Sequence, residues 1–180
     1  MTSTASESTW KLDPAHSSAE FKVKHLMISN VKGKFTGLSG SLTLDEFNIA
    51  GSKVEASIDI ATIHTGDAQR DGHLKSADFF DAEKFPTITF KSTGVRRTGD
   101  DEYVVTGDLT IHGITKSVDL RVEVGTQGKD PWGNTRLGLS AETKINRKDF
   151  GLTYNAALET GGVLVGEEVS ISIDAEFIKG

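Results

Sequence analysis

Histidine, arginine and serine side chains are the groups of this sequence that could do chemistry, and their spacing decides which chemistry is open to them. A zinc site needs three or four converging ligands, commonly from positions two to four residues apart. The five histidines are instead spread singly along the chain, at His16, His25, His64, His73 and His112. We interpret them as structural histidines at strand ends and turns, and we predict no metal site. His73 is the exception of most interest, because Arg70 and Asp71 lie beside it.

Hydrolytic chemistry would need a nucleophile with an adjacent base. The chain has no cysteine, so no thiol nucleophile exists. The segments Gly37–Gly40 and Gly138–Ser140 place serine within two residues of glycine, but neither has the Gly-x-Ser-x-Gly pattern of a nucleophile turn. Acidic residues are frequent, yet in strands they alternate with apolar residues and therefore belong to a solvated face. The sequence predicts no catalytic site, no cofactor and no enzyme activity.

Charge and hydropathy exclude further classes of protein. A net charge of −6 argues against nucleic-acid binding, which needs a basic surface. No apolar run approaches the ~18 residues of a membrane-spanning helix. Residues 1–9 are rich in serine and threonine and lack the basic and apolar regions of a signal peptide, so we expect a disordered segment there and a cytoplasmic protein. A processed chain behind an added Met1 would look the same, and a periplasmic location is then expected.

The elements that must position these residues are mostly strands. Apolar and polar residues alternate in five runs, at residues 20–24, 54–60, 118–124, 137–142 and 169–177. Gly94 and the segment Thr98–Asp101 bracket a short strand, and Gly113 marks a hairpin turn. Only Asp67–Asp81 looks helical, with Asp67 as N-cap, although Gly72 makes two short turns an equal alternative. Eight to ten such strands form either a barrel or a sandwich, and periodicity does not decide between them.

Four motifs resemble those of the YceI-like family of lipocalin-fold, polyisoprenoid-binding proteins. They lie at residues 10–35, 70–90, 107–116 and 145–151, and they include Trp10, His73, His112 and Arg147. The resemblance implies an all-β fold, an eight-stranded antiparallel lipocalin-like β-barrel with a short helical insertion over residues 10–180. It also implies a long-chain isoprenoid lipid, a quinone or a prenyl phosphate, held in the barrel without chemistry, and a homodimer. Many members of the family are exported.

The resemblance together with the alternation suggests which residues bind the lipid. We expect inward-facing residues of several strands and of the insertion to line the cavity: Phe21, Val23, Phe35, Ile58, Ile60, Phe80, Phe90, Leu120, Leu139 and Ile173. Arg70 and His73, with Arg147, could hold a polar head group. The alternative for the two arginines is structural pairing with Asp71, Asp78 or Asp149, because arginine is suited to bidentate carboxylate pairing.

Five lysines give the N-terminal strands a basic outer face, at Lys11, Lys22, Lys24, Lys32 and Lys34. Such a face either keeps the protein soluble or allows transient contact with an anionic membrane surface. Two other functions stay open at this point. One is an enzyme that acts on an isoprenoid lipid, with His73 as acid and Arg70 as anion clamp. The other is a ligand-free stress or structural protein that works through an oligomeric surface.

Overall fold

Ten strands dominate the computed structural model, which describes residues 7–156, 158 and 164–180. The strands are β1 (Glu7–Leu12), β2 (Ser18–His25), β3 (Ser29–Phe35), β4 (Leu38–Asp45), β5 (Lys53–Asp59), β6 (Thr87–Gly99), β7 (Glu102–Ile111), β8 (Ile114–Lys129), β9 (Thr135–Asn146) and β10 (Val165–Lys179). One α-helix, α1 (Ala68–Lys75), follows β5, and short 3-10 turns are η2 (Pro14–His16), η3 (Ile49–Gly51), η4 (Ile60–Thr62) and η5 (Arg147–Phe150). No described helix is long and apolar enough to cross a membrane.

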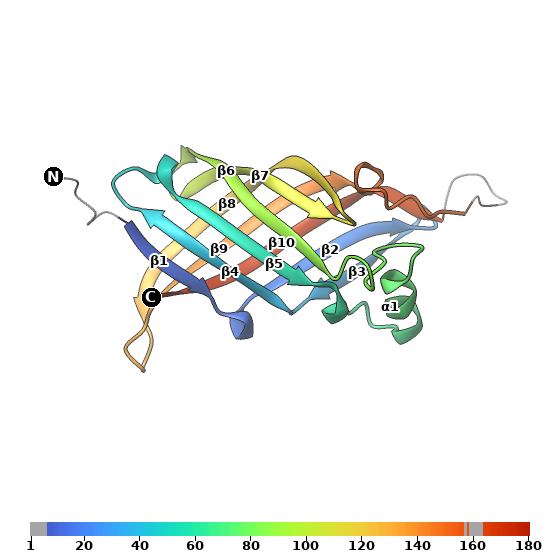
Figure 1. The fold of residues 1–180 in the computed structure, drawn as a ribbon, viewed down its shortest axis with the longest axis horizontal. Coiled ribbons are helices and arrows are strands. Elements are labelled where there is room, and N and C mark those ends of the chain that lie inside the picture. The colour runs from blue at the N-terminus through green and yellow to red at the C-terminus, as the bar shows by residue number, and fades with distance from the viewer. Residues whose placement is uncertain (1–6, 157, 159–163) are drawn as a thin grey trace.

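The sheet closes on itself through the two ends of the chain. β1 pairs with β4 on one side and with β10 on the other, where Trp10 lies opposite Lys179. β2 continues the line of β1 along β10, and β3 continues the line of β4, so the ten segments form an eight-stranded barrel. All pairs are antiparallel, as the slanted arrows of Figure 1 show. This confirms the predicted eight-stranded antiparallel barrel and rules out the alternative of a β-sandwich.

Two predictions about strand limits were wrong. β6 continues through Gly94, where its register against β7 shifts by one residue, so Gly94 marks a bulge inside a strand and does not end one. Strand β1 begins at Glu7, which lies opposite Asp45, whereas the sequence predicts a disordered segment over residues 1–9. The rest of that segment lies outside the described residues. The predicted turn at Gly113 is present, with positive φ at both His112 and Gly113.

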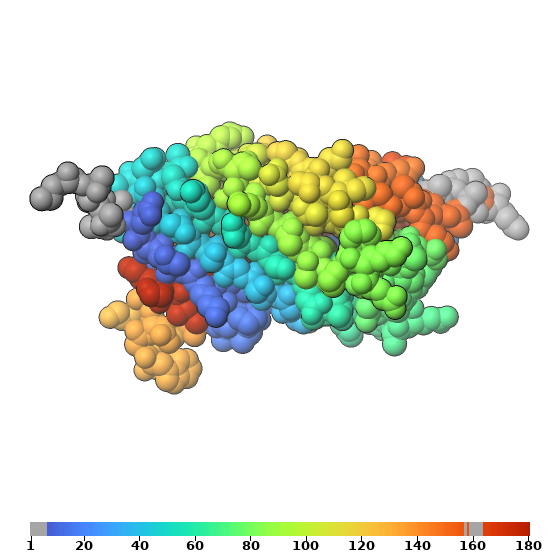
Figure 2. All heavy atoms as spheres, in the orientation of Figure 1, coloured from blue at the N-terminus to red at the C-terminus, as the bar shows by residue number. Residues whose placement is uncertain are grey.

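Asp67 starts the helix as predicted, since its side chain accepts hydrogen bonds from the backbone N–H groups of Gln69 and Arg70. The helix spans only Ala68–Lys75, and hydrogen-bonded turns carry the chain on to Asp81. The predicted helical segment is thus one helix followed by turns. It lies against one end of the barrel (Figure 1), which it covers on the face shown in Figure 2.

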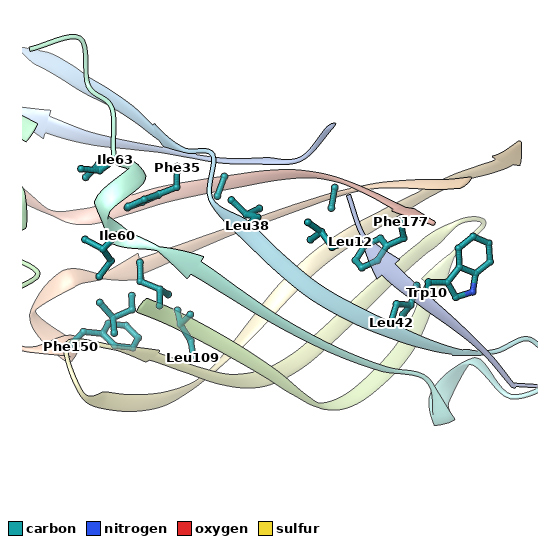
Figure 3. Packing of buried hydrophobic residues seen from close by; sticks show 14 of the residues in the cluster. Trp10, Leu12, Phe35, Leu38, Leu42, Ile60, Ile63, Leu109, Phe150 and Phe177 are labelled. Carbon is teal, nitrogen blue, oxygen red and sulfur yellow. The ribbon is translucent and has the colours of Figure 1, made fainter. Parts of the chain in front are cut away.

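The buried side chains of the main core cluster are spread along the interior of the barrel (Figure 3). Trp10, Leu42 and Phe177 lie toward the end that holds the chain termini, whereas Ile60 and Phe150 lie toward the α1 end. Several inward side chains of the long strands, such as Leu120, Leu139 and Ile173, are only partly buried, although Val105, Val122 and Ala141 form a second, smaller buried cluster. Such partial burial indicates that the side chains do not fill the middle of the barrel.

Candidate binding cavity

The barrel encloses a cavity with a volume of about 650 Å³. This lies within the range of about 300–1,000 Å³ that is usual for small-molecule sites. Every strand contributes to the wall, together with α1 and the turns that follow it. Alternate residues of each strand point inward, as Leu120, Val122 and Val124 of β8 do, and they make the middle of the wall aliphatic.

Aromatic rings join the helical insertion to the barrel wall. The ring centroid of Phe35 lies 5.7 Å from that of Phe21 and 6.0 Å from that of Phe80. Phe80 belongs to the turns after α1, and its backbone N–H donates to the carbonyl of Leu74 in the helix. The insertion therefore supplies part of the apolar wall at its end of the cavity.

Arg70 lies on the wall at the α1 end and is fixed by Thr65. Its Nε donates to Thr65 Oγ1 at 2.8 Å, and its Nη2 donates to the Thr65 carbonyl at 2.8 Å. The carboxylate of Asp71 accepts from the Thr65 hydroxyl and backbone N–H. Thr65 thus separates Arg70 from Asp71, so the alternative that these two residues pair directly is wrong.

His73 lies in an aromatic cluster at the same end. Its ring centroid is 5.1 Å from those of Phe79 and Tyr154, in edge-on geometry, and Nε2 lies 2.8 Å from Asp78 Oδ2. Phe79 and Tyr154 also contact each other, with centroids 5.0 Å apart. All three rings lie on the cavity wall, so this cluster offers a hydrogen-bonded imidazole and a phenol beside an apolar space.

Arg147 is the most unusual charged residue of the wall, because it is only 4% exposed. Its guanidinium donates to the carbonyls of Leu152 at 2.6 Å, Gly166 at 2.7 Å and Val165 at 3.2 Å. Among the described residues no carboxylate forms an ion pair with it, so the predicted alternative of pairing with Asp149 is wrong. Burial lowers the pKa of Arg147 from its ordinary value, while the charge of Glu167 acts in the opposite direction.

Polar groups also occur at the opposite end of the cavity, where the turns between β4 and β5 and between β6 and β7 lie (Figure 1). Glu46, Lys53 and Tyr103 belong to the wall here. Asp45 orders the β4–β5 turn, because its carboxylate accepts hydrogen bonds from the backbone N–H groups of Phe47 and Asn48. A ligand in the cavity would therefore meet an apolar middle and a polar group at either end.

Of the residues predicted to bind lipid, all except Ile60 lie on the cavity wall: Phe21, Val23, Phe35, Ile58, Arg70, His73, Phe80, Phe90, Leu120, Leu139 and Ile173. Ile60 is fully buried in the core. The side chain of Asp59 accepts from the N–H of Ala61 and starts the 3-10 turn η4, so the strand alternation ends before Ile60. The prediction that Ile60 lines the cavity was wrong for this reason.

Sequence reasoning missed part of the wall. Val54, Val122 and Val124 line it and belong to alternating runs, so the same signal could have found them. Leu152, Tyr154 and Leu164 line it from irregular segments, which carry no periodic pattern. Leu74 comes from the short helix, where no clear apolar stripe marks it.

The described residues contain no group of three histidine, cysteine, aspartate or glutamate side chains that could hold a metal ion. The histidines sit in separate places. His16 contacts Asp13, His64 bridges to Lys34 through the backbone, and His112 packs edge-on against Phe85 at a centroid distance of 5.0 Å. The geometry of the site is that of a binding cavity with fixed polar groups at its ends.

Comparison with known proteins agrees with this geometry. A family model described as a YceI-like domain matches residues 10–177. A UPF0312 protein of Vibrio cholerae is 44% identical over 143 residues, which are 79% of this chain and 76% of the relative. The crystal structure of Burkholderia cenocepacia BcnA has a TM-score of 0.80 at 26% identity and covers 92% of this chain and 98% of its own.

A structure described as a polyisoprenoid binding domain from Saccharophagus degradans has the same fold, with a TM-score of 0.70. It is 18% identical and covers 95% of this chain and 98% of its own. The family model spans nearly the whole barrel and includes the cavity wall on every strand. The chain belongs to the YceI-like family.

Proposed function

We propose that this protein is a non-catalytic carrier that holds one long-chain isoprenoid lipid, a quinone or a prenyl phosphate, in the barrel cavity. The observation that carries the proposal is the cavity itself, of about 650 Å³, with an aliphatic and aromatic middle. Apolar, preformed cavities of this size are typical of sites for greasy ligands. The solved neighbour described as a polyisoprenoid binding domain is in keeping with this proposal.

The chain of such a lipid would supply most of the affinity. Each buried methylene contributes ~0.8 kcal/mol, so burial of roughly sixteen carbons gives about 13 kcal/mol before costs. Association costs about 4–15 kcal/mol in lost freedom. Burial of a long chain can therefore offset the cost of association, whereas a small apolar solute buries too few carbons to do so.

The head group is expected at the α1 end, where Arg147, Arg70, His73 and Tyr154 lie on the wall. A single hydrogen bond suffices to orient a ligand whose tail supplies the binding energy. Arg147 has three of its five N–H groups committed to carbonyls of the chain, which leaves donor capacity on a buried cation. A quinone oxygen or a phosphate oxygen is an acceptor for that capacity.

Native mass spectrometry of freshly purified protein, with organic extraction of the bound lipid, tests the proposal. A quinone or prenyl chain at about one per barrel is the expected result. Ile173→Trp places a large ring in the cavity and should abolish co-purification, whereas Ser172→Trp places the same ring outside. The spectra also report whether the protein is the homodimer that the family resemblance implies.

Two results would overturn the carrier. Equal lipid content in Ile173→Trp and Ser172→Trp would show that the ligand lies elsewhere. Turnover of labelled prenyl phosphate, lost in His73→Ala, would instead establish the enzyme alternative, since His73 and Asp78 form a close pair on the cavity wall.

A further inference from the structure

The turn between β2 and β3 exposes three consecutive aliphatic residues. Leu26, Met27 and Ile28 are 38%, 52% and 83% exposed. The backbone of the turn is fixed, because the N–H of Leu26 donates to the carbonyl of Leu164 at 2.8 Å. Leu26 and Met27 both have positive φ, a conformation that hairpins usually give to glycine or asparagine. Bulky aliphatic residues at such positions serve no purpose in folding that the described structure shows.

Four lysines lie on the outer face of the same hairpin. Lys22 and Lys32 lie directly opposite each other in the register of β2 and β3, whereas Lys24 lies opposite Asn30 and Lys34 opposite Glu20. All four are exposed. Like charges opposite each other in a sheet repel, so this arrangement lowers the stability of the hairpin.

Elsewhere on the outer face of the barrel, three pairs of opposite charge lie across neighbouring strands. Lys91 pairs with Glu55, Arg121 with Glu142, and Lys144 with Glu168. Among the described residues, by contrast, no carboxylate forms an ion pair with Lys22, Lys24, Lys32 or Lys34. A chain with a net charge of −6 thus concentrates unpaired positive charge beside its most apolar exposed turn.

We propose that the β2–β3 hairpin is a docking surface for an anionic lipid bilayer, with Leu26–Ile28 entering the headgroup region and the four lysines contacting lipid phosphates. Aliphatic tips flanked by lysine are the pattern of proteins that bind at the membrane interface. Lysines near an anionic leaflet attract it and are screened by salt. A nucleic acid would suit the lysines but not the aliphatic tip, and an acidic protein surface would leave the tip without an apolar partner.

The docking surface adjoins the cavity, so docking would bring the cavity close to the bilayer. His25 lies on the cavity wall, and so does Leu164, whose carbonyl accepts the hydrogen bond from Leu26 in the turn. Docking would therefore turn the α1 end of the cavity toward the bilayer (Figure 1), where a lipid could pass between the two. The inference adds a membrane contact to the proposed carrier, but the contact itself does not depend on what the cavity holds.

Flotation of the purified full chain with vesicles tests the docking. The vesicles contain about 30% phosphatidylglycerol in phosphatidylcholine, with pure phosphatidylcholine as comparison. We expect binding to the anionic vesicles at about 50 mM salt and its loss at about 500 mM. Lys22→Ser with Lys32→Ser should weaken binding about 30-fold. Met27→Ser with Ile28→Ser should weaken it at least about tenfold.

Trp132→Ser is the matched control, because Trp132 is 79% exposed on the β8–β9 turn at the opposite end of the barrel. It should bind vesicles as the unaltered protein does. The docking surface would be overturned if both hairpin variants bound anionic vesicles as strongly as the unaltered protein does. It would also be overturned if the unaltered protein did not bind these vesicles at low salt. Native mass spectrometry measures the bound lipid and therefore tests the carrier function separately from docking. We expect the lipid content of the purified hairpin variants to equal that of the unaltered protein.

Discussion

Arg136 Nη1 lies 2.8 Å from Asp13 Oδ2, so the last strand pair of the barrel is tied to the turn that follows the first strand. Arg136 belongs to β9 and also contacts Asp130 at 2.7 Å and Glu176 of β10 at 3.3 Å. The group lies beside the pairing of β1 with β10, which closes the barrel. Hydrogen bonds from Arg136 lower the pKa values of Asp13 and Asp130 from 3.8 to about 2.

These lowered pKa values predict a specific acid sensitivity. Each carboxyl has a lower pKa in the folded than in the unfolded chain, so the unfolded chain binds more protons as pH falls. The stabilisation is present above about pH 4 and is lost toward about pH 2. Urea unfolding between pH 5 and pH 2 should show a falling midpoint, and Arg136→Met should both lower the midpoint at pH 5 and flatten its pH dependence.

Arg121→Met is the control for this experiment, because Arg121 forms an exposed pair with Glu142 at 3.4 Å. Exposed pairs contribute little to stability, so this variant should retain the pH dependence of the unaltered protein. If the unfolding midpoint of Arg136→Met fell with pH as steeply as that of the unaltered protein, the two aspartates would not be responsible for the acid sensitivity.

Arg147 should be important for stability whatever the cavity holds. Arg147→Met removes three hydrogen bonds and leaves the carbonyls of Leu152, Val165 and Gly166 without this donor. We expect the free energy of unfolding to fall by about 3 kcal/mol, measured with urea on delipidated protein. Arg70→Met, which loses two bonds to Thr65 at the cavity rim, should cost about 1 kcal/mol. Similar costs for both would contradict the buried role of Arg147.

Most of the strand predictions succeeded because they rest on local alternation. The run at residues 169–177 is the clearest in the sequence and lies wholly within β10. The inward residues Leu139 and Ile173 followed from the same pattern and from the family resemblance. Gly94 misled the prediction, because a glycine within a bulge and a glycine that ends a strand look alike in sequence.

Other features depend on contacts that no local pattern contains. Closure of the barrel needs Trp10 to meet Lys179, at the far end of the chain. Tyr154 reaches the cavity from an irregular segment, and Arg147 could be assigned to carbonyl groups only once Val165 and Gly166 were placed beside it. The sequence therefore predicted the apolar wall better than the polar ends.

Residues of the wall and of the core should respond differently to truncation. Phe150 is 1% exposed and packed on all sides, so Phe150→Ala should lower the free energy of unfolding by about 4 kcal/mol. Phe90 is partly buried and faces the cavity, and Phe90→Ala should cost about 2 kcal/mol, since fewer contacts are lost. Urea unfolding of delipidated protein measures both, and equal losses would mean that the interior at Phe90 is filled.

Gly33 leaves room for the ring of Phe21, which lies opposite it in the register of β2 and β3. A methyl group at residue 33 would clash with the Phe21 ring and lie 2.9 Å from Thr65 Cγ2. Gly33→Ala should therefore push Phe21 into the cavity, lower the free energy of unfolding by about 2 kcal/mol and reduce the bound lipid. Gly138→Ala is the control, because its methyl group meets no atom within 4 Å.

A second substitution separates this crowding from a general loss of folding. Phe21→Leu shortens the side chain that the new methyl group meets, so the double variant Gly33→Ala with Phe21→Leu should recover both stability and lipid content relative to Gly33→Ala alone. Lipid extraction and urea unfolding of the four proteins form a double-mutant cycle, and contacting residues should deviate from additivity by at least about 0.5 kcal/mol. Strictly additive effects would mean that the Phe21 ring does not transmit the change at Gly33 to the cavity.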